Sequence, residues 1–494
     1  MKSYEYIIVG AGISGCSTAH ELSKHSNSIL IIDKNSGIAQ GASGAAGAFL
    51  SPLLGKPNLF KNLVSKSLEY STKFYQKNFP LHINNCGTTR IPQNEEDEKK
   101  FQEYIPYMDF PYIKEKDGYF FPIGSVVDSS NVCESMIKSS SMIEKKFNYE
   151  VTSVENLKDV WRINNEIETQ NIIFTTGSDV SLIDQFYLNI RGVWGQRIDI
   201  STSSSFTHNY HKACSISQSK ILNEEKYLVS IGATHHRNKE DIVNTLENTN
   251  ELLKKANDIQ ELKDVEVLNH YIGARACSND YFPVVGSIID SQKTLDEFPY
   301  LINGTHVESK RFTRFKNGYV LTGVGGRGFV LAPYLAKLLV ESIINKTLKL
   351  VSAQFVNHSI KVVKDIDNVE IVALENEFLQ VLINILNNAR DALISMDKKD
   401  KYIFINVYKK NEKSVCISIK DNANGINENI IDKIFEPYFT TKYKAQGTGI
   451  GLYMSEEIIT KHMYGKIEVN NTSYKYKDKE EIGAQFIITL PLKI

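Results

Sequence analysis

The chain has 494 residues, of which 42% are hydrophobic and 23% charged, and its 57 basic and 58 acidic side chains nearly cancel. This length is enough for at least two domains, and the composition is ordinary for a globular protein. No apolar run approaches the roughly 18 residues that would span a bilayer, and the balanced charge excludes a broadly basic nucleic-acid-binding protein. Any RNA-binding surface therefore has to be a local patch.

The sequence favours a cytoplasmic protein with no membrane segment. A strand pattern begins at Tyr4, which leaves no room for a signal peptide. The six cysteines lie far apart and form no Cys-x-x-Cys pair, so they predict reduced thiols rather than a zinc site.

The first nucleotide-binding signature follows a short apolar strand at residues 5–9. Gly10 permits a tight turn, Gly12 lets the backbone approach a pyrophosphate, and Gly15 lets a helix pack closely. The free N–H groups at the start of that helix then face the phosphates. A second strand at residues 29–32 ends in Asp33, which we expect to hold the ribose hydroxyls.

Three later segments favour a large planar cofactor. Residues 41–47 have almost no side-chain volume, which suits backbone passing closely against a ligand. The strand at residues 172–176 ends in Gly177, and the strand at residues 318–324 enters a glycine-rich turn before a helix predicted to end at Ile344.

Residues 1–346 resemble the FAD-dependent oxidases of the D-amino-acid oxidase and glycine oxidase superfamily. They are most similar to the oxidase domain of the bifunctional tRNA 5-methylaminomethyl-2-thiouridine biosynthesis proteins. The resemblance is carried by the first glycine turn and by four further motifs: Gly41–Gly44, Ser51–Leu54, Ile272–Arg275 with Asp280 and Pro283–Gly286, and Gly325–Gly328.

This resemblance implies a Rossmann-like α/β FAD-binding domain built from about residues 1–80, 131–192 and 271–346. A β-rich substrate domain would comprise about residues 81–130 and 193–270. The residues implied to contact FAD are Gly10, Gly12, Gly15, Asp33, Ala42, Ser43, Gly44, Gly177, Gly325, Gly326 and Gly328.

The resemblance also implies oxidation of a CH–NH group. Arg275 would bind the substrate carboxylate with its planar fork of donors, and Arg327 would either face the flavin or fix the glycine turn. A carboxymethylaminomethyl group on a tRNA wobble uridine carries such a carboxylate and would be converted to aminomethyl. A small amine of the glycine or sarcosine type is the alternative substrate. Because the family's methyltransferase domain is absent from this sequence, a separate methyltransferase is a possible partner.

The pattern changes near residue 355 and predicts a new α+β domain. Strands are expected at residues 358–363, 402–408 and 414–420, with a long amphipathic helix at residues 377–395. Asn384 and Asn388 lie four residues apart on this helix, where carboxamides suit Mg²⁺ and triphosphate oxygens.

Residues 352–494 resemble the ATP-binding catalytic domain of sensor histidine kinases, an α+β sandwich. Four motifs carry the resemblance: 384–392, 421–426, 435–442 and 447–452. It implies ATP with Mg²⁺ as ligands and Asn388 as the residue that binds the metal. The implied ATP-binding residues are Asn384, Asn388, Asp421, Gly425, Lys442, Gly447, Gly449 and Gly451. Ala423 departs from the family's usual glycine.

Two features limit kinase chemistry. Related ATPases place a glutamate base where this chain has Asn384, which favours kinase-type use of ATP over hydrolysis. A histidine kinase also needs a two-helix segment with a phospho-accepting histidine, and the junction expected at residues 347–354 has no room for one. His358 lies in a strand pattern, so a phospho-acceptor would have to be a separate partner.

Three interpretations of the join remain. The chain is an oxidase with a regulatory ATP-binding domain, a signalling protein whose flavin domain senses redox state, or an accidental or artificial fusion of two truncated genes. We favour the oxidase as the dominant function because its motifs are complete.

Overall fold

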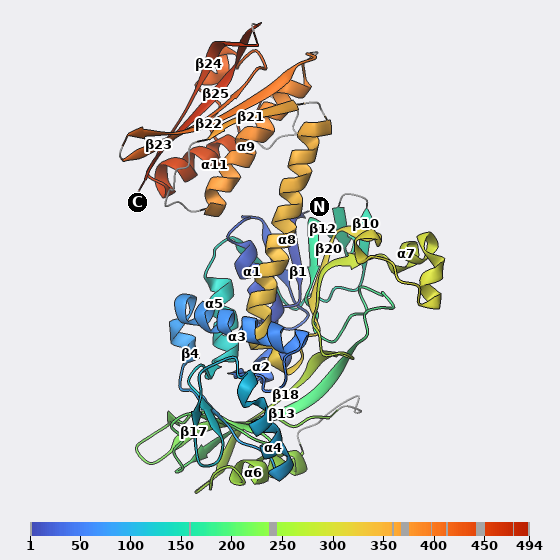
Figure 1. Cartoon of the computed structure of the whole chain (residues 1–494), viewed down its shortest axis with the longest axis vertical. Coiled ribbons are helices and arrows are strands. Elements are labelled where there is room, and N and C mark those ends of the chain that lie inside the picture. The colour runs from blue at the N-terminus through green and yellow to red at the C-terminus, as the bar shows by residue number, and fades with distance from the viewer. Residues whose placement is uncertain are drawn as a thin grey trace. The chain divides into compact units, whose positions relative to one another are not determined.

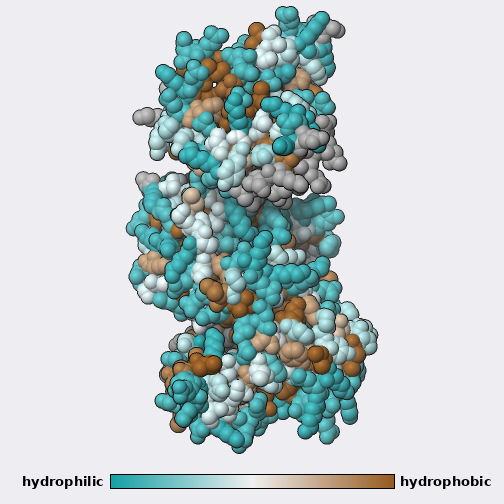
Figure 2. Space-filling view, turned by 90° about the vertical axis from the view of Figure 1, so that its left-hand side faces the viewer, coloured by the Kyte–Doolittle hydropathy of each residue, from teal (hydrophilic) through white to brown (hydrophobic). Residues whose placement is uncertain are grey.

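The computed structural model of the chain describes residues 2–157, 160–236, 245–357, 360–366, 375–396, 398–411, 413–440, 450–477 and 479–492. Its contacts define two compact units, Met1–Ser342 and Ile343–Ile494 (Figure 1). Among the described helices, none combines the length and the hydropathy needed to cross a membrane. On the face shown in Figure 2, hydrophilic residues separate the hydrophobic patches.

A largely parallel sheet forms the centre of the first unit. Its strand order is β10-β11-β12-β1-β2-β9, and β20 lies beside the second half of β12, with β19 antiparallel to β20. Parallel strands are covered on both faces, which explains why every residue of β2 is apolar and buried. The strands are β1 (Lys2–Val9), β2 (Ile29–Ile32), β9 (Ile143–Lys146), β10 (Val154–Leu157), β11 (Val160–Ile163), β12 (Ile167–Phe174), β19 (Val284–Ile289) and β20 (Arg314–Thr322).

The described helices of this unit surround the two larger sheets (Figure 1). They are α1 (Ile13–Leu22), α2 (Ala42–Ala45), α3 (Leu59–Asn78), α4 (Glu95–Tyr104), α5 (Ser129–Lys138), α6 (Leu246–Asn257), α7 (Ser291–Glu297) and the first part of α8 (Gly328–Asn357). Ser71 of α3 donates a hydrogen bond to the carbonyl of Val330, and Tyr75 donates one to that of Phe329, so α3 is fixed to the start of α8.

A second, mixed sheet has the order β18-β13-β17-β15-β14-β5-β7-β6, with β16 beside β17. Its strands are β5 (Thr88–Arg90), β6 (Ile113–Lys114), β7 (Tyr119–Phe121), β13 (Ile190–Thr202), β14 (Asn209–His211), β15 (Ser215–Ile216), β16 (Lys220–Ile221), β17 (Tyr227–Gly232) and β18 (Glu266–Ser278). A small sheet joins β3 (Phe49–Leu50), β8 (Ser125–Val127) and β4 (Ile83–Asn84). A Rossmann-like sheet next to a β-rich part is the fold class predicted for this half, and it is confirmed.

Arg275 lies on β18, a strand of the second sheet. From the sequence, we predicted that the chain from residue 271 onward belongs to the FAD-binding part. Arg275 instead lies on the second sheet because β18 pairs with β13, most of which falls in the range predicted for the substrate domain.

The second unit is a five-stranded sheet with the order β21-β22-β23-β25-β24 and helices on one face (Figure 1). Val381, Ile385, Ala389 and Leu393 of α9 recur every four residues and are buried against the inner face of the sheet. The elements are β21 (Ile360–Ile366), α9 (Glu375–Ile394), β22 (Lys401–Asn411), β23 (Ser414–Asp421), α10 (Glu428–Ile431), α11 (Gly451–Glu457), β24 (Lys466–Tyr476) and β25 (Lys479–Pro491). The predicted α+β sandwich is confirmed, and His358 lies outside the described residues.

The helix α8 differs from the sequence prediction. We expected a helix ending at Ile344 and a connector at residues 347–354, but α8 continues through these positions to Asn357. Between Pro333 and Asn357 the chain contains no glycine or proline, the residues that most strongly disfavour a helix interior. Nothing in this stretch therefore ends the helix.

The buried imidazole of His20 predicts an acid-sensitive first unit. His20 is 8% exposed, and its ring meets Phe74 and Phe79 edge to face. Burial, with a smaller repulsion from Lys24, lowers its pKa from 6.5 to about 4. The unfolded chain takes up this proton first, so the stabilising effect is complete above about pH 6.5 and is lost as the pH falls towards 4.

We expect this proton to remove about 2 kcal/mol of unfolding free energy between pH 7.5 and pH 5. Urea unfolding of the wild type and of His20→Gln at both pH values measures the effect, because the variant lacks the titrating group. His306→Gln, at an exposed histidine, is the control and should behave as wild type. An equal pH-dependent loss in the wild type and in His20→Gln contradicts the prediction.

Candidate functional site

The glycine turn after β1 brings the backbone of Gly10 into contact with the start of α1. Gly10 has a φ of +107° and donates a hydrogen bond from its N–H to the Ile32 carbonyl at 2.7 Å. A Cβ atom on Gly15 would lie well inside 3.0 Å of the Gly10 carbonyl oxygen, closer than real Cβ atoms approach. Only glycine therefore allows α1 to begin this close to the turn.

Asp33 is tied to the same turn. Its Oδ2 accepts a hydrogen bond from the Ala11 N–H at 2.7 Å, and its Oδ1 accepts from the backbone and side chain of Asn35. Asp33 also lines the cavity described below. Its predicted contact with ribose hydroxyls stays a prediction, and the structure adds a second role, which is to hold the glycine turn.

The small-residue segment packs against the start of α1. The Ile13 N–H donates to Ser43 Oγ at 2.9 Å, which places α2 beside the glycine turn. A Cβ on Gly273 of β18 would lie 2.7 Å from the Cα of Ala42, so glycine there brings the second sheet up to this segment.

A cavity of about 1130 Å³ runs from this turn to the second sheet. The predicted residues that line it are Gly10, Gly12, Asp33, Ala42, Ser43, Gly177, Arg275, Gly325, Gly326, Arg327 and Gly328. Gly15 and Gly44 lie behind its wall, where they permit close packing. The volume exceeds that of most small-molecule pockets and is enough for a dinucleotide and a small substrate.

The two predicted arginines both reach the cavity. Arg275 Nη1 donates to the Thr234 carbonyl at 3.2 Å, and its guanidinium occupies the space that a side chain at position 195 would fill. Arg327 Nη1 donates to the Ser51 carbonyl at 3.2 Å. Burial lowers the pKa of Arg275, and it lowers that of Arg327 to about 10. A guanidinium group is the most strongly basic of the side chains, so both are treated as cations.

Arg90 and His211 also belong to the site and were not predicted from the sequence. They lie on the short strands β5 and β14, which pair in parallel with Arg90 opposite His211, and both line the cavity. Burial, followed by the charges of Arg90 and Arg327, holds the pKa of His211 well below its usual value, so its ring is neutral. Strands of three residues are too short to show a periodic pattern, so neither residue could be recognised from the sequence.

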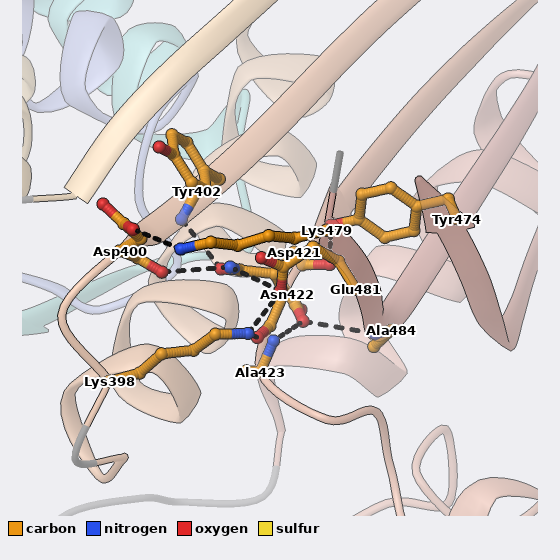
Figure 3. A network of polar contacts seen from close by, with 10 residues as sticks. All are labelled: Lys398, Asp400, Tyr402, Asp421, Asn422, Ala423, Tyr474, Lys479, Glu481 and Ala484. Atoms are coloured by element: carbon orange, nitrogen blue, oxygen red, sulfur yellow. Dashed lines mark hydrogen bonds and ion pairs between the residues drawn. The ribbon is translucent and has the colours of Figure 1, made fainter. Parts of the chain in front are cut away.

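In the second unit, Asp421 ends β23 with its carboxylate held from two sides (Figure 3). Oδ1 accepts from the Ala423 N–H at 2.9 Å and from the Ala484 N–H at 3.2 Å. Burial raises the pKa of this carboxyl group. The Tyr474 hydroxyl donates to the Asp421 carbonyl at 2.9 Å, and neither Tyr474 nor Ala484 was identified from the sequence.

A polar network supports the residue next to Asp421. Asn422 is fully buried; its Oδ1 accepts from the Tyr402 N–H at 2.8 Å, and its Nδ2 donates to Glu481 at 3.1 Å. Lys398 pairs with Glu481 and donates to the Asn422 carbonyl (Figure 3). The side chains fix the end of β23 against β22 and β25, so Asp421 is held on a rigid support.

The remaining predicted ATP-binding residues fall into three groups. Asn384 Nδ2 donates to the Gly451 carbonyl at 3.1 Å and to Ser455 Oγ at 3.3 Å, which joins α9 to α11; Asn388 lies one turn further along α9. Gly425 has a φ of +77° in the turn after Asp421. Lys442, Gly447 and Gly449 lie outside the described residues.

The Ala423 departure is accommodated by the backbone. In this turn Asn424, with a φ of 60°, and Gly425 have left-handed backbone conformations, and Ala423 does not. Alanine therefore introduces no backbone strain at this position.

From its place at the end of a strand, Asp421 is expected to accept a hydrogen bond from the adenine amino group of ATP, so Asp421→Asn should weaken ATP binding by about 10- to 100-fold. The amide oxygen can keep both backbone hydrogen bonds, but the other oxygen becomes an NH₂ donor that cannot accept from an adenine amino group. Titration with a fluorescent ATP analogue measures the effect, and Asp432→Asn, at an exposed carboxylate of the same unit, is the control. Unchanged affinity in Asp421→Asn excludes an adenine contact.

The cavity begins at a glycine turn after a parallel strand and ends among arginines on a separate sheet. An oxidoreductase that holds a dinucleotide beside its substrate has this arrangement. Residues 5–342 match the family model described as FAD dependent oxidoreductase, which covers more than half of the chain. The chain therefore belongs to the FAD-dependent oxidoreductase family. Residues 373–494 match the model described as histidine kinase-, DNA gyrase B-, and HSP90-like ATPase.

The curated relatives fall into two groups, one similar to the first part of the chain and the other similar to the last part. The tRNA 5-methylaminomethyl-2-thiouridine biosynthesis bifunctional protein MnmC of Campylobacter concisus is 25% identical over 369 residues, covering 69% of this chain and 56% of that protein. The corresponding Legionella pneumophila (strain Corby) protein is 24% identical over 383 residues, covering 71% and 55%. The chain thus spans about half the length of these relatives. The signal transduction histidine-protein kinase AtoS of Escherichia coli is 35% identical over 154 residues, covering 31% of this chain and 23% of the kinase.

Solved structures share the fold of the first half. The glycine oxidase of Bacillus cereus has a TM-score of 0.56 at 17% identity and covers 69% of this chain and 95% of that structure. The glycine oxidase of Geobacillus kaustophilus has a TM-score of 0.55 at 16% identity, covering 70% and 95%.

The described residues fit FAD. The glycine turn at Gly10 and Gly15 has no space for side chains, the cavity has a volume large enough for a dinucleotide, and Asp33 lines it next to that turn, where a ribose is expected.

Proposed function

We propose that the first unit oxidises the CH–NH bond of an amine that carries a carboxylate. The observation that supports this best is Arg275, a half-buried cation that lines the cavity and takes part in none of the ion pairs found among the described residues. A partly buried charge without a partner is unfavourable, and a substrate carboxylate would compensate it with two parallel hydrogen bonds.

FAD, when bound, supplies the oxidation of the C–N single bond to an imine, which water then cleaves to a carbonyl compound and a shorter amine. The chain's residues position the substrate. Arg275 holds the carboxylate, while its hydrogen bond to Thr234 fixes the direction of the guanidinium fork. Neutral His211, with its Nδ1 2.7 Å from Ser215 Oγ, adds no further positive charge to the cavity and offers the substrate a hydrogen-bonding group.

We propose as substrate the carboxymethylaminomethyl group of a tRNA wobble uridine, which would be converted to aminomethyl in the cytoplasm, with a separate methyltransferase acting afterwards. The names of the curated relatives support this choice. A free amine of the glycine or sarcosine type is the second candidate, and it is favoured by the fold shared with glycine oxidases.

We further propose that the second unit binds ATP with Mg²⁺, using Asp421 for adenine and Asn388 for the metal. The residue assignments are 1–346 for the oxidase and 355–494 for the ATP-binding domain. Because the described residues show no two-helix phospho-acceptor segment, any phosphoryl transfer would go to a separate protein. A signalling protein with a redox-sensing flavin remains the alternative for the whole chain.

The test is anaerobic reduction of the bound flavin by glycine, by sarcosine and by tRNA bearing carboxymethylaminomethyl uridine. Bleaching of the flavin absorbance by the modified tRNA alone supports the tRNA substrate. Bleaching by glycine or sarcosine assigns the protein to small-amine oxidation. A full-length chain that cannot be loaded with FAD overturns the oxidase proposal.

A further inference from the structure

The cavity contains a second cationic group that is separate from Arg275. Arg90 Nη1 donates to the Pro52 carbonyl at 3.1 Å and lies 3.5 Å from Ser51 Oγ, while Arg327 donates to the Ser51 carbonyl. Two guanidinium groups therefore share one dipeptide, Ser51–Pro52, as their anchor. Arg275 is anchored elsewhere, on the Thr234 carbonyl.

The positive charges of Arg90 and Arg327 repel each other. Apart from burial, the charge of Arg327 is the main influence that lowers the pKa of Arg90, to about 9. Both charges also act on His211, the residue opposite Arg90 in the sheet, but neither is among the influences on Arg275. Arg90 and Arg327 thus form one group that shares an anchor, whereas the Arg275 side chain passes beside Gly326 and is anchored on Thr234.

Their positive charge is only partly offset by the described chain. The charge of Asp97 acts favourably on Arg90, but none of the ion pairs found among the described residues involves Arg90, Arg275 or Arg327, and Arg90 Nε is buried without a hydrogen-bond partner. Both side chains are half-buried; carbonyl groups satisfy part of each guanidinium but cannot offset two like charges placed together with limited access to water.

The carboxylates that line the cavity lie at its other end. Asp33 binds the glycine turn through the Ala11 N–H. Asp179 pairs with Lys34, the residue after Asp33, and Glu150 follows Tyr149, whose N–H donates to the Asp33 carbonyl. The cavity is therefore acidic where a ribose is expected and cationic where a substrate is expected.

We propose that Arg90 and Arg327 form a second anion subsite and that the natural substrate is an amine with two anionic groups, one on Arg275 and one on this pair. The proposal rests on the proposed oxidase function and narrows its substrate class. For an RNA substrate the second group is a phosphate of the nucleotide, and for a small amine it is a second carboxylate.

Non-oxidisable anions test the subsite on the full FAD-loaded chain. Methoxyacetate offers one carboxylate, diglycolate offers two, and phosphoglycolate offers a carboxylate and a phosphate. Binding is measured both by the change in flavin absorbance and by the shift in melting temperature, so the subsite is detected even if no amine reduces the flavin.

We expect the wild type to bind at least one of the two dianions about tenfold or more tightly than methoxyacetate. Arg90→Gln should lose about tenfold in affinity for that dianion and less than about threefold for methoxyacetate, whereas Arg275→Gln should weaken all three anions. The preferred dianion distinguishes a phosphate from a second carboxylate. Arg162→Gln is the matched control, because Arg162 pairs with Glu168 at 2.8 Å and does not line the cavity.

Three results would overturn the proposal. The first is equal binding of the monoanion and both dianions by the wild type. The second is an equal loss for methoxyacetate and the dianions in Arg90→Gln, which would make one shared carboxylate site. The third is loss of FAD from Arg90→Gln with retention in Arg90→Lys, which would assign Arg90 to the cofactor. Failure of every amine to reduce the flavin, with these anion affinities intact, would instead count against the oxidase function.

Discussion

Replacement of Gly15 by alanine should leave a purified chain with little or no bound FAD. The added Cβ would fall well inside 3.0 Å of the Gly10 carbonyl and 2.8 Å from Thr175 Oγ1. The Thr175 hydroxyl donates to that same carbonyl at 2.9 Å, so the obstacle is a hydrogen-bonded turn that cannot move alone. The helix α1 would have to shift away from β1, which costs about 1–3 kcal/mol and displaces the N–H groups that are expected to face the pyrophosphate of FAD.

The ratio of flavin to protein absorbance after gel filtration measures this effect. Gly37→Ala is the matched control, because its Cβ would meet only the flexible end of the Gln40 side chain and Gly37 does not line the cavity. The control should keep its flavin. Full flavin content and unchanged stability in Gly15→Ala would show that the turn does not hold the cofactor.

Arg275→Gln should lower kcat/KM for a carboxylate-bearing amine by about 30-fold to several thousandfold. This range corresponds to about 2–5 kcal/mol, the usual loss when one partner of a buried charge pair is removed. Glutamine ends short of the Nη1 position that donates to Thr234, and it offers neither the charge nor the planar fork that a carboxylate accepts from.

Anaerobic flavin reduction over a range of amine concentrations separates binding from the rate of oxidation. The substrate's amide is the decisive comparison, because it lacks the anionic group and should react similarly with the wild type and Arg275→Gln. Arg275→Lys should recover part of the affinity through its charge. An equal loss for the acid and for the amide would show that Arg275 maintains the cavity rather than binding the carboxylate.

The parts of the site that lie close together in sequence were predictable. The glycine turn, Asp33 and the glycines around Arg327 each depend on a short local pattern, and the structure places them on one cavity. Asp421 was predictable for the same reason, since a carboxylate that ends a strand before a glycine turn has a local signature.

The parts that depend on strand pairing between distant segments were not predictable. Arg90 reaches the cavity because β5 pairs with β14, more than a hundred residues away, and neither strand is long enough to show a pattern. Ala484 and Tyr474 approach Asp421 only through the pairing of β23, β25 and β24. The end of α8 was missed because the sequence contained no stop signal, and we inferred one from the change of motif.

The strand order of the first sheet also sets when this unit can fold during synthesis. Its central strand β1 is made at once, but its neighbour β12 begins at Ile167 and the next parallel strand, β20, begins only at Arg314. A nascent chain that has not yet reached β20 presents the edge of β12 without a partner, including Phe174, which is 1% exposed in the folded unit. Contacts this far apart in sequence form slowly, so the unit depends on protection from aggregation until nearly all of it has been translated.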